Sequence, residues 1–168
     1  MTAVSARRAF LRGKFRKNDP VRPFGAAGWQ EFCDVCDRCD ACAEACPDGI
    51  IAFDEDGFPV LDAQAGACTF CGDCTNACPT DALDVSRPWP WMASVGTTCL
   101  STNGVQCRIC EDQCDARAIR FRLALGGRST PQIDMEACTG CAECVAPCPA
   151  GAISLTRTPR KEETMTTC

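Results

Sequence analysis

Cysteines dominate the chemistry that this sequence can perform. Eighteen of the 168 residues are cysteines, and twelve of them form three copies of one pattern. In each copy, three cysteines are spaced by two residues, a fourth follows after three more, and a proline comes next. This spacing is typical of bacterial [4Fe-4S] proteins, in which three thiolates wrap one cluster and the fourth turns to a neighbouring cluster. The copies are Cys36-Cys39-Cys42-Cys46, Cys68-Cys71-Cys74-Cys78 and Cys138-Cys141-Cys144-Cys148.

A further motif departs from this pattern. Its first two cysteines, Cys99 and Cys107, are separated by seven residues instead of two. Cys110 and Cys114 then follow at the usual spacing, and Asp115 stands where the other copies have proline. Lengthening a loop costs little closure entropy, so the longer loop can still close on a cluster of the same kind. The sequence therefore predicts four [4Fe-4S] sites.

The spacings also predict an internal repeat. The second motif is the first shifted by 32 residues, and the last is the second shifted by 70, so residues 31–85 and 98–156 resemble two copies of one two-cluster unit. Hairpins are expected over 50–61 and 118–134, short strands over 82–85 and 152–155, and brief helical turns before each fourth cysteine. The expected fold is α+β, with two tandem bacterial 2[4Fe-4S] ferredoxin-like units. A basic arm (1–30), a Pro/Trp linker (86–97) and a disordered tail (157–168) complete the expected organisation.

If the fourth cysteine of each motif binds the cluster of the other motif in its unit, the sequence predicts four ligand sets. Cluster one takes Cys36, Cys39, Cys42 and Cys78, and cluster two takes Cys68, Cys71, Cys74 and Cys46. Cluster three takes Cys99, Cys107, Cys110 and Cys148, and cluster four takes Cys138, Cys141, Cys144 and Cys114. All irons would then be held by cysteine with no open position for a substrate, so the chain is not expected to be an enzyme.

Two cysteines remain outside the sets. Cys33 extends the two-residue spacing upstream and could replace Cys42 in the first triplet, but the ending of that motif favours the triplet that starts at Cys36. Cys168 ends the polar tail and is expected to be incidental. Four-cysteine zinc sites and structural disulfides are the competing interpretations of so many cysteines, but zinc does not require the third cysteine and the proline.

Composition and charge exclude several functions. The chain has no histidine, which excludes Ser-His-Asp and Cys-His catalysis, His-ligated haem and Rieske-type clusters. Its net charge of −5 does not suggest nucleic-acid binding, and no run of 18 apolar residues predicts a membrane span. The charge is uneven: residues 1–22 carry seven basic groups and one acid, whereas residues 31–84 carry thirteen acids and one base.

The basic arm resembles the core of a twin-arginine export signal at Arg7-Arg8-Ala9-Phe10-Leu11-Arg12. The apolar stretch that such a signal needs does not follow, because the next residues are Gly13, Lys14, Phe15 and Arg16. We therefore expect a retained, cytoplasmic protein. The arm is either a solvated tail or a docking element for a partner. In the linker, Trp89 and Trp91 are expected either to pack between the two units or to contact a partner.

The sequence resembles the NapF family of ferredoxin-type accessory proteins of the periplasmic nitrate reductase system over roughly residues 5–155. The residues that carry the resemblance are the arm from Arg7-Arg8 to Arg16-Lys17, Arg22-Pro23, 36–42, the Cys99 spacing, 105–110, 118–122 and Pro131-Gln132. The resemblance implies a cytoplasmic protein with four [4Fe-4S] clusters. It also implies binding to the precursor of the nitrate reductase catalytic subunit and help in its maturation before export. The alternative is an electron-transfer carrier or an iron–sulfur subunit of an oxidoreductase, with a redox donor protein as partner.

Overall fold

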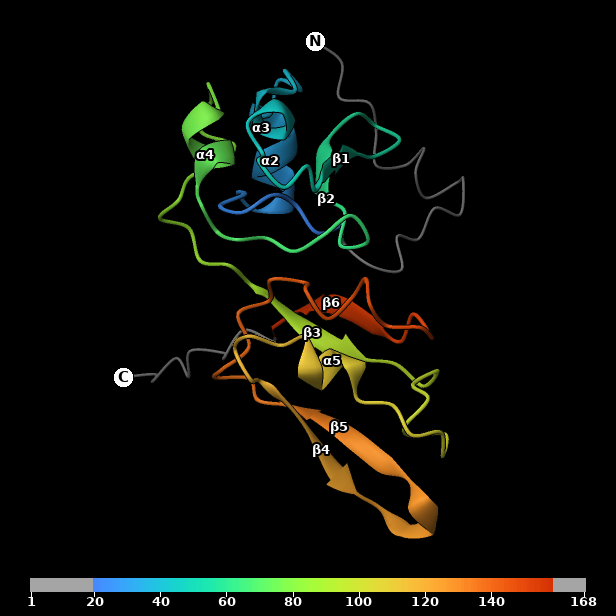
Figure 1. The fold of residues 1–168 in the computed structure, drawn as a ribbon. Coiled ribbons are helices and arrows are strands. Elements are labelled where there is room, and N and C mark those ends of the chain that lie inside the picture. Colours follow the sequence, from blue (N-terminus) through green and yellow to red (C-terminus); the bar gives the residue numbers. More distant parts are fainter. Residues whose placement is uncertain (1–19, 159–168) are drawn as a thin grey trace, which may run out of the picture.

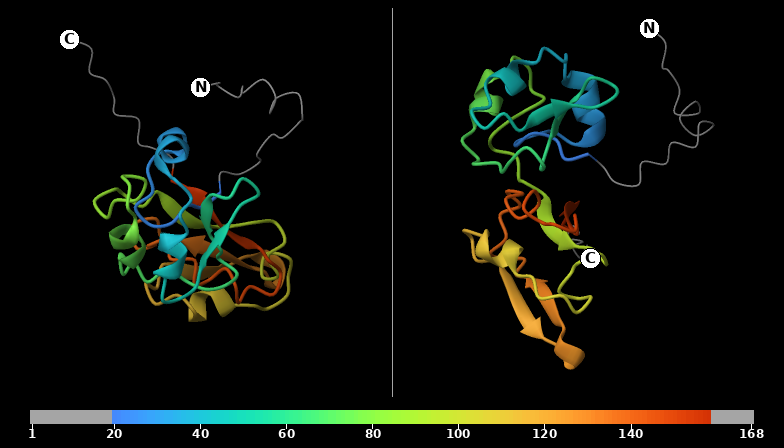
Figure 2. Two further views of the ribbon diagram at one scale, coloured as in Figure 1. Left: turned by 90° about the horizontal axis from the view of Figure 1, so that it is seen from above. Right: turned by 45° about the vertical axis from the view of Figure 1, so that its right-hand side comes forward.

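The computed structural model describes residues 20–158, which form two units stacked end to end (Figure 1). Most of the expected basic arm (1–19) and most of the expected tail (159–168) lie outside the described residues. The amino-terminal unit holds three short helices, and the carboxy-terminal unit holds most of the sheet structure, including a hairpin over 119–133 that projects away from the first unit (Figure 2). No helix within residues 20–158 has both the length and the apolar character to cross a membrane.

The first unit is built on one short hairpin and three short helices. Its elements are α2 (Trp29–Val35), α3 (Ala41–Glu44), β1 (Ile51–Phe53), β2 (Pro59–Leu61) and α4 (Asp73–Ala77). The predicted hairpin is confirmed, since β1 and β2 pair antiparallel with Ile51 opposite Leu61. Its turn is fixed by Asp54, whose Oδ1 accepts the N–H groups of Asp56 and Phe58 at 3.0 and 2.9 Å. The strand expected over 82–85 is reduced to an isolated bridge between Ala26 and Leu83.

The second unit contains two antiparallel pairs of longer strands. Its elements are β3 (Trp91–Val95), α5 (Ile109–Asp112), β4 (Ile119–Leu123), the 3-10 turn η1 (Leu125–Gly127), β5 (Ser129–Ile133) and β6 (Ile153–Arg157). The predicted second hairpin is confirmed as β4–β5. The short strand predicted over 152–155 is confirmed as β6.

The expected linker is only partly a linker. Residues 91–95 form β3, which pairs with β6 so that Trp91 faces Arg157 and Val95 faces Ile153. The second unit therefore begins at about Trp91 and not at residue 98, and Arg157 belongs to its last strand and not to a tail. Pairing across some sixty residues of sequence explains why a segment rich in proline and tryptophan is ordered here.

The first unit also begins earlier than residue 31. The amide N–H of Ala27 donates to the Ala82 carbonyl at 3.0 Å, and that of Asp84 donates to the Gly25 carbonyl at 2.9 Å. Helix α2 follows, and its Phe32 is completely buried against Phe58. The residues from about 21 to 30 are thus part of the first unit, so the basic arm ends before them.

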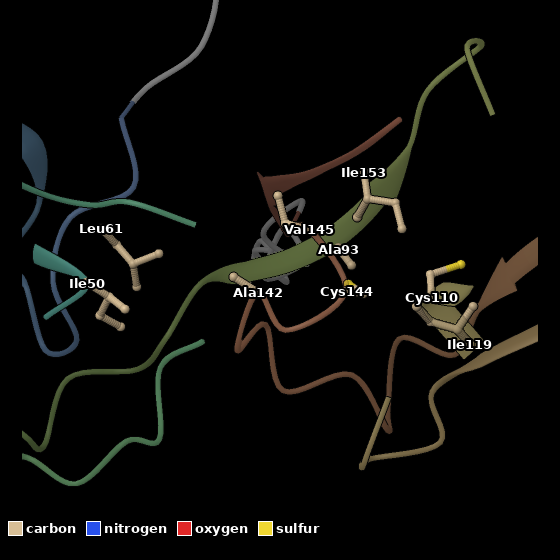
Figure 3. Packing of buried hydrophobic residues seen from close by; sticks show 9 residues of the cluster. All are labelled: Ile50, Leu61, Ala93, Cys110, Ile119, Ala142, Cys144, Val145 and Ile153. Carbon is tan, nitrogen blue, oxygen red and sulfur yellow. The ribbon is translucent and has the colours of Figure 1, made fainter. Parts of the chain in front are cut away.

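A buried apolar cluster joins the two units. Ile50 and Leu61 of the first unit lie at one end of it, and Cys110 and Ile119 of the second unit lie at the other (Figure 3). Ala93, Ala142, Cys144, Val145 and Ile153 fill the space between. Trp89 packs at the same boundary, with its ring 6.1 Å from that of Phe24 and 5.8 Å from that of Phe70. Packing of Trp89 between the units, one of the two predicted roles, is confirmed.

Candidate metal centres

Four cavities in the structure are each lined by four cysteines, and each takes three of them from one motif and the fourth from the motif paired with it. Cavity one is lined by Cys36, Cys39, Cys42 and Cys78. Cavity two is lined by Cys46, Cys68, Cys71 and Cys74. Cavity three is lined by Cys99, Cys107, Cys110 and Cys148. Cavity four is lined by Cys114, Cys138, Cys141 and Cys144. The structure therefore brings together the same sets of cysteines that the spacing predicts as ligand sets.

The geometry of the cavities suits a bulky cluster. Within residues 20–158, no three Cys, Asp or Glu side chains converge closely enough to hold a single metal ion. The sixteen cysteines are free thiols rather than halves of disulfides. They surround four similar spaces, each partly open to solvent. Four thiolates around such a space form the ligand set of a [4Fe-4S] cluster.

The loops that carry the triplets have a shared backbone conformation. Two positions between the cysteines take positive φ in each regular motif: Arg38 and Asp40 in the first, Phe70 and Gly72 in the second, and Gly140 and Ala142 in the last. Left-handed residues in a tight loop turn successive N–H groups toward one concave side, which favours a bound anion. A cluster held by four thiolates is anionic, so the loops and the thiols fit the same group. Only the two glycines signal this conformation in the sequence.

The irregular motif reaches its cavity through a loop that folds on itself. The Cys99 carbonyl accepts hydrogen bonds from the Asn103 side chain and from the Thr102 hydroxyl, both at 2.8 Å. Ser101 is buried and docks the loop on β5, because its carbonyl accepts the Ser129 N–H at 3.3 Å. These contacts bring Cys99, itself buried, to Cys107, Cys110 and Cys148 in cavity three.

The fourth cysteine of each motif leaves its own loop at the end of a short helix or turn. Helix α3 ends just before Cys46, and α4 ends just before Cys78. In the second unit the corresponding sulfurs also accept backbone hydrogen bonds: the Ala118 N–H points to Cys114 Sγ at 3.4 Å, and the Ala152 N–H to Cys148 Sγ at 3.3 Å. Such bonds orient a thiolate and stabilise its charge.

Burial makes at least one thiol of each cavity a poor acid in the metal-free chain, and Cys36 and Cys68 also have a raised pKa for this reason. Desolvation, followed by the charge of neighbouring thiolates, raises the pKa of the third cysteine of each motif. The pKa is raised to about 11 for Cys42 and Cys110, and to about 12 for Cys74 and Cys144. Iron must displace these protons when it binds, so the cysteine clusters are arranged to be ionised by metal rather than by solvent.

Cys33 is not among the residues that line the four cavities. It belongs to α2 and packs beside the buried cluster that contains Phe32 and Phe58, and it does not line cavity one. Cavity one instead takes the triplet that begins at Cys36. Cys168 lies outside the described residues.

Comparison with known proteins agrees with this arrangement. The profile of the 4Fe-4S dicluster domain family matches twice, at residues 35–82 and 105–152, and leaves Cys99 outside the second match. The chain is 36% identical over 157 residues to the ferredoxin-type protein NapF of Escherichia coli K12, an alignment that covers 92% of this chain and 96% of the relative. NapF of Haemophilus influenzae is 36% identical over 122 residues, which cover 52% of this chain and 69% of that one.

A more distant relative belongs to another system. The methylamine utilization ferredoxin-type protein MauM of Paracoccus denitrificans is 32% identical over 160 residues, which cover 83% of this chain and 71% of the relative. The two dicluster matches, the near full-length similarity to NapF and the cysteine-lined cavities agree with one another. The chain belongs to the NapF family of ferredoxin-type proteins, which carry 4Fe-4S dicluster domains.

Proposed function

We propose that the protein holds four [4Fe-4S] clusters, one in each cavity, with the sixteen cysteines that line them as ligands. We further propose that it binds the cytoplasmic precursor of the periplasmic nitrate reductase catalytic subunit and assists its maturation before export. The observation that carries the first proposal is the grouping of the cysteines into four sets around four similar cavities. The second is supported by the similarity to NapF over most of the chain.

Iron analysis tests the number of clusters. We expect anaerobic reconstitution of the full chain to reach about sixteen irons and about sixteen sulfides, because each cluster takes four of each. A plateau near half of that value would contradict the assignment for the unit that contains the irregular motif. Stoichiometric zinc without sulfide would overturn the cluster assignment altogether.

The basic arm is the part of the chain that we assign to precursor binding. Residues 1–22 carry a net charge of +6 and a twin-arginine-like core. Arg22 is the exception, because it is buried in the first unit and paired with Asp54. The remaining arm charges would attract an acidic partner surface and orient the encounter, an effect that weakens as salt is added.

Anaerobic co-purification from the cytoplasm tests this role. Changing Arg7, Arg8 and Arg12 to Gln is expected to abolish recovery of the precursor while the iron content stays unchanged. The matched control changes Lys14, Arg16 and Lys17 to Gln, which removes the same charge but keeps the twin-arginine-like core. Equal loss in both variants indicates that charge alone binds the partner. Full binding in both would contradict the assignment of the arm.

The similarity to MauM favours a second candidate, an electron-transfer carrier or an iron–sulfur subunit of another oxidoreductase. The same experiment separates the two. A carrier would be recovered with a redox partner at every stage of nitrate reductase synthesis, whereas a maturation protein binds only the precursor before export.

A further inference from the structure

We propose that the two units form a single electron pathway in which cavities two and four are the exchange pair across the unit boundary. The proposal rests on the cluster assignment above. Its basis is a contact between two ligand loops: the amide N–H of Cys68 donates to the carbonyl of Cys141 at 2.8 Å. Cys68 lines cavity two and Cys141 lines cavity four. A direct connection between the two sites therefore runs through the covalent bonds of Cys68, this hydrogen bond and the covalent bonds of Cys141.

The space between these two cavities is closed by apolar side chains. Ile50 and Leu61 line cavity two, while Ala93 and Ala142 line cavity four, and all four belong to the buried cluster of Figure 3. None of them is more than 7% exposed. Because these four side chains are buried, the direct contact between the two sites runs through protein atoms and not through solvent, whose reorganisation would oppose electron transfer.

Trp89 holds the boundary together from one side. Its Nε1–H donates to the Gly140 carbonyl at 3.2 Å, and its ring packs against Phe24 and Phe70. Both phenylalanines line cavity two, and Gly140 lines cavity four. The aromatic group therefore spans the same two sites as the backbone hydrogen bond.

Gly140 shows how closely the loop of cavity four approaches the segment that leads into the second unit. The corresponding positions in the first two motifs hold Arg38 and Phe70, with φ of 60° and 56°, so positive φ alone does not require glycine here. A Cβ on Gly140 would clash with the Trp91 carbonyl oxygen and lie 2.7 Å from Trp89 Nε1. Glycine at this position permits contact between the loop of cavity four and the segment that joins the units.

Within each unit the two cavities each contribute a thiol to the same buried cluster. Cys42 of cavity one and Cys74 of cavity two belong to one buried cluster, and Cys110 of cavity three and Cys144 of cavity four belong to another. The pathway therefore runs one, two, four, three. Cys68 and its three partners would hold the cluster of cavity two, and Cys141 and its three partners that of cavity four. The clusters would supply one-electron transfer, in which the donor cluster would be oxidised and the acceptor cluster reduced.

EPR spectroscopy of the dithionite-reduced full chain, with iron analysis of the same samples, tests this order, because neighbouring reduced clusters broaden each other's lines. Cys71→Ala should remove the cluster of cavity two. The EPR lines of the second unit should then become narrower, because the neighbouring cluster that broadens them is gone. Cys39→Ala, which removes the cluster of cavity one, should leave those signals unchanged. Equal spectra of the second unit in the two variants would overturn the proposed order.

A second comparison tests the contact between the loops of cavities two and four. It still tests the proposed order if a cysteine variant loses both clusters of its unit. Trp89→Leu should loosen the contact, because it removes the Nε1–H bond to Gly140 and the packing on Phe24 and Phe70 without changing a residue of a ligand loop. We expect loss of the inter-unit broadening at wild-type iron content. Trp29→Leu is the matched control, because that ring packs on Phe58 within the first unit, and it should keep the broadening. Wild-type line widths in Trp89→Leu would overturn the junction even with all four clusters present. An iron content near half in the wild type would instead contradict the cluster assignment.

Discussion

Changing Cys46 to Ala is expected to remove the cluster of the second motif and to leave that of the first motif intact. Cys46 belongs to the first motif by sequence, but it lines cavity two together with Cys68, Cys71 and Cys74. Loss of one thiolate leaves three ligands and an open iron, from which a cluster is readily lost. We expect iron to fall by about four of about sixteen atoms per chain.

The missing EPR component identifies which cluster is lost. Cys46→Ala should lack the same component as Cys71→Ala, and Cys78→Ala should lack the same component as Cys39→Ala. Cys33→Ala is the control, because this thiol does not line cavity one, and it should keep the wild-type iron content. If Cys46→Ala instead matched Cys39→Ala, the exchange of fourth ligands between motifs would be wrong.

The grouping of the cysteines could be predicted because the ligand spacing is local and repeated. The triplet of each regular motif lies within seven consecutive residues, and even the irregular triplet, from Cys99 to Cys110, lies within twelve. The hairpins β1–β2 and β4–β5 were predictable for the same reason, since each connects neighbouring strands through a short turn.

The unit boundaries could not be predicted from local patterns. Strand β3 is recognisable only through β6, its partner some sixty residues away. Its own sequence is preceded by Pro88 and Pro90, which suggest a linker. Helix α2 was missed because Trp29 and Phe32 follow directly on a segment whose charge marked it as an arm. Charge counting cannot distinguish a solvated arginine from a buried one, and Arg22 is the clearest example.

Arg22 forms a buried ion pair in the first unit. Its guanidinium donates to Asp54 Oδ2 at 2.8 Å and to the Pro59 carbonyl at 2.9 Å, and it stacks 4.4 Å from the centre of the Trp29 ring. Its side chain is 4% exposed and that of Asp54 is 13% exposed. Burial alone would raise the pKa of Asp54, but the hydrogen bonds from Arg22 and from the Phe58 amide outweigh it and lower that pKa below its usual value. The Asp54 carboxylate is therefore ionised, and its charge is compensated by Arg22.

Changing Arg22 to Ala is expected to destabilise the first unit by about 3 kcal/mol, because removing one partner leaves the charge of Asp54 buried without its counter-ion. In urea, the unfolding midpoint of the cluster-loaded chain should fall by about 1 M or more, the shift that this energy produces for a small domain. Loss of cluster absorbance under anaerobic conditions reports the transition. The matched control is Arg157→Ala, since Arg157 also lies over a tryptophan ring, 5.1 Å from the centre of Trp91, but is exposed on β6 and lines none of the four cysteine cavities. That change should cost less than about 1 kcal/mol. Equal urea midpoints for the two variants would show that the buried contacts of Arg22 add no stability to the first unit.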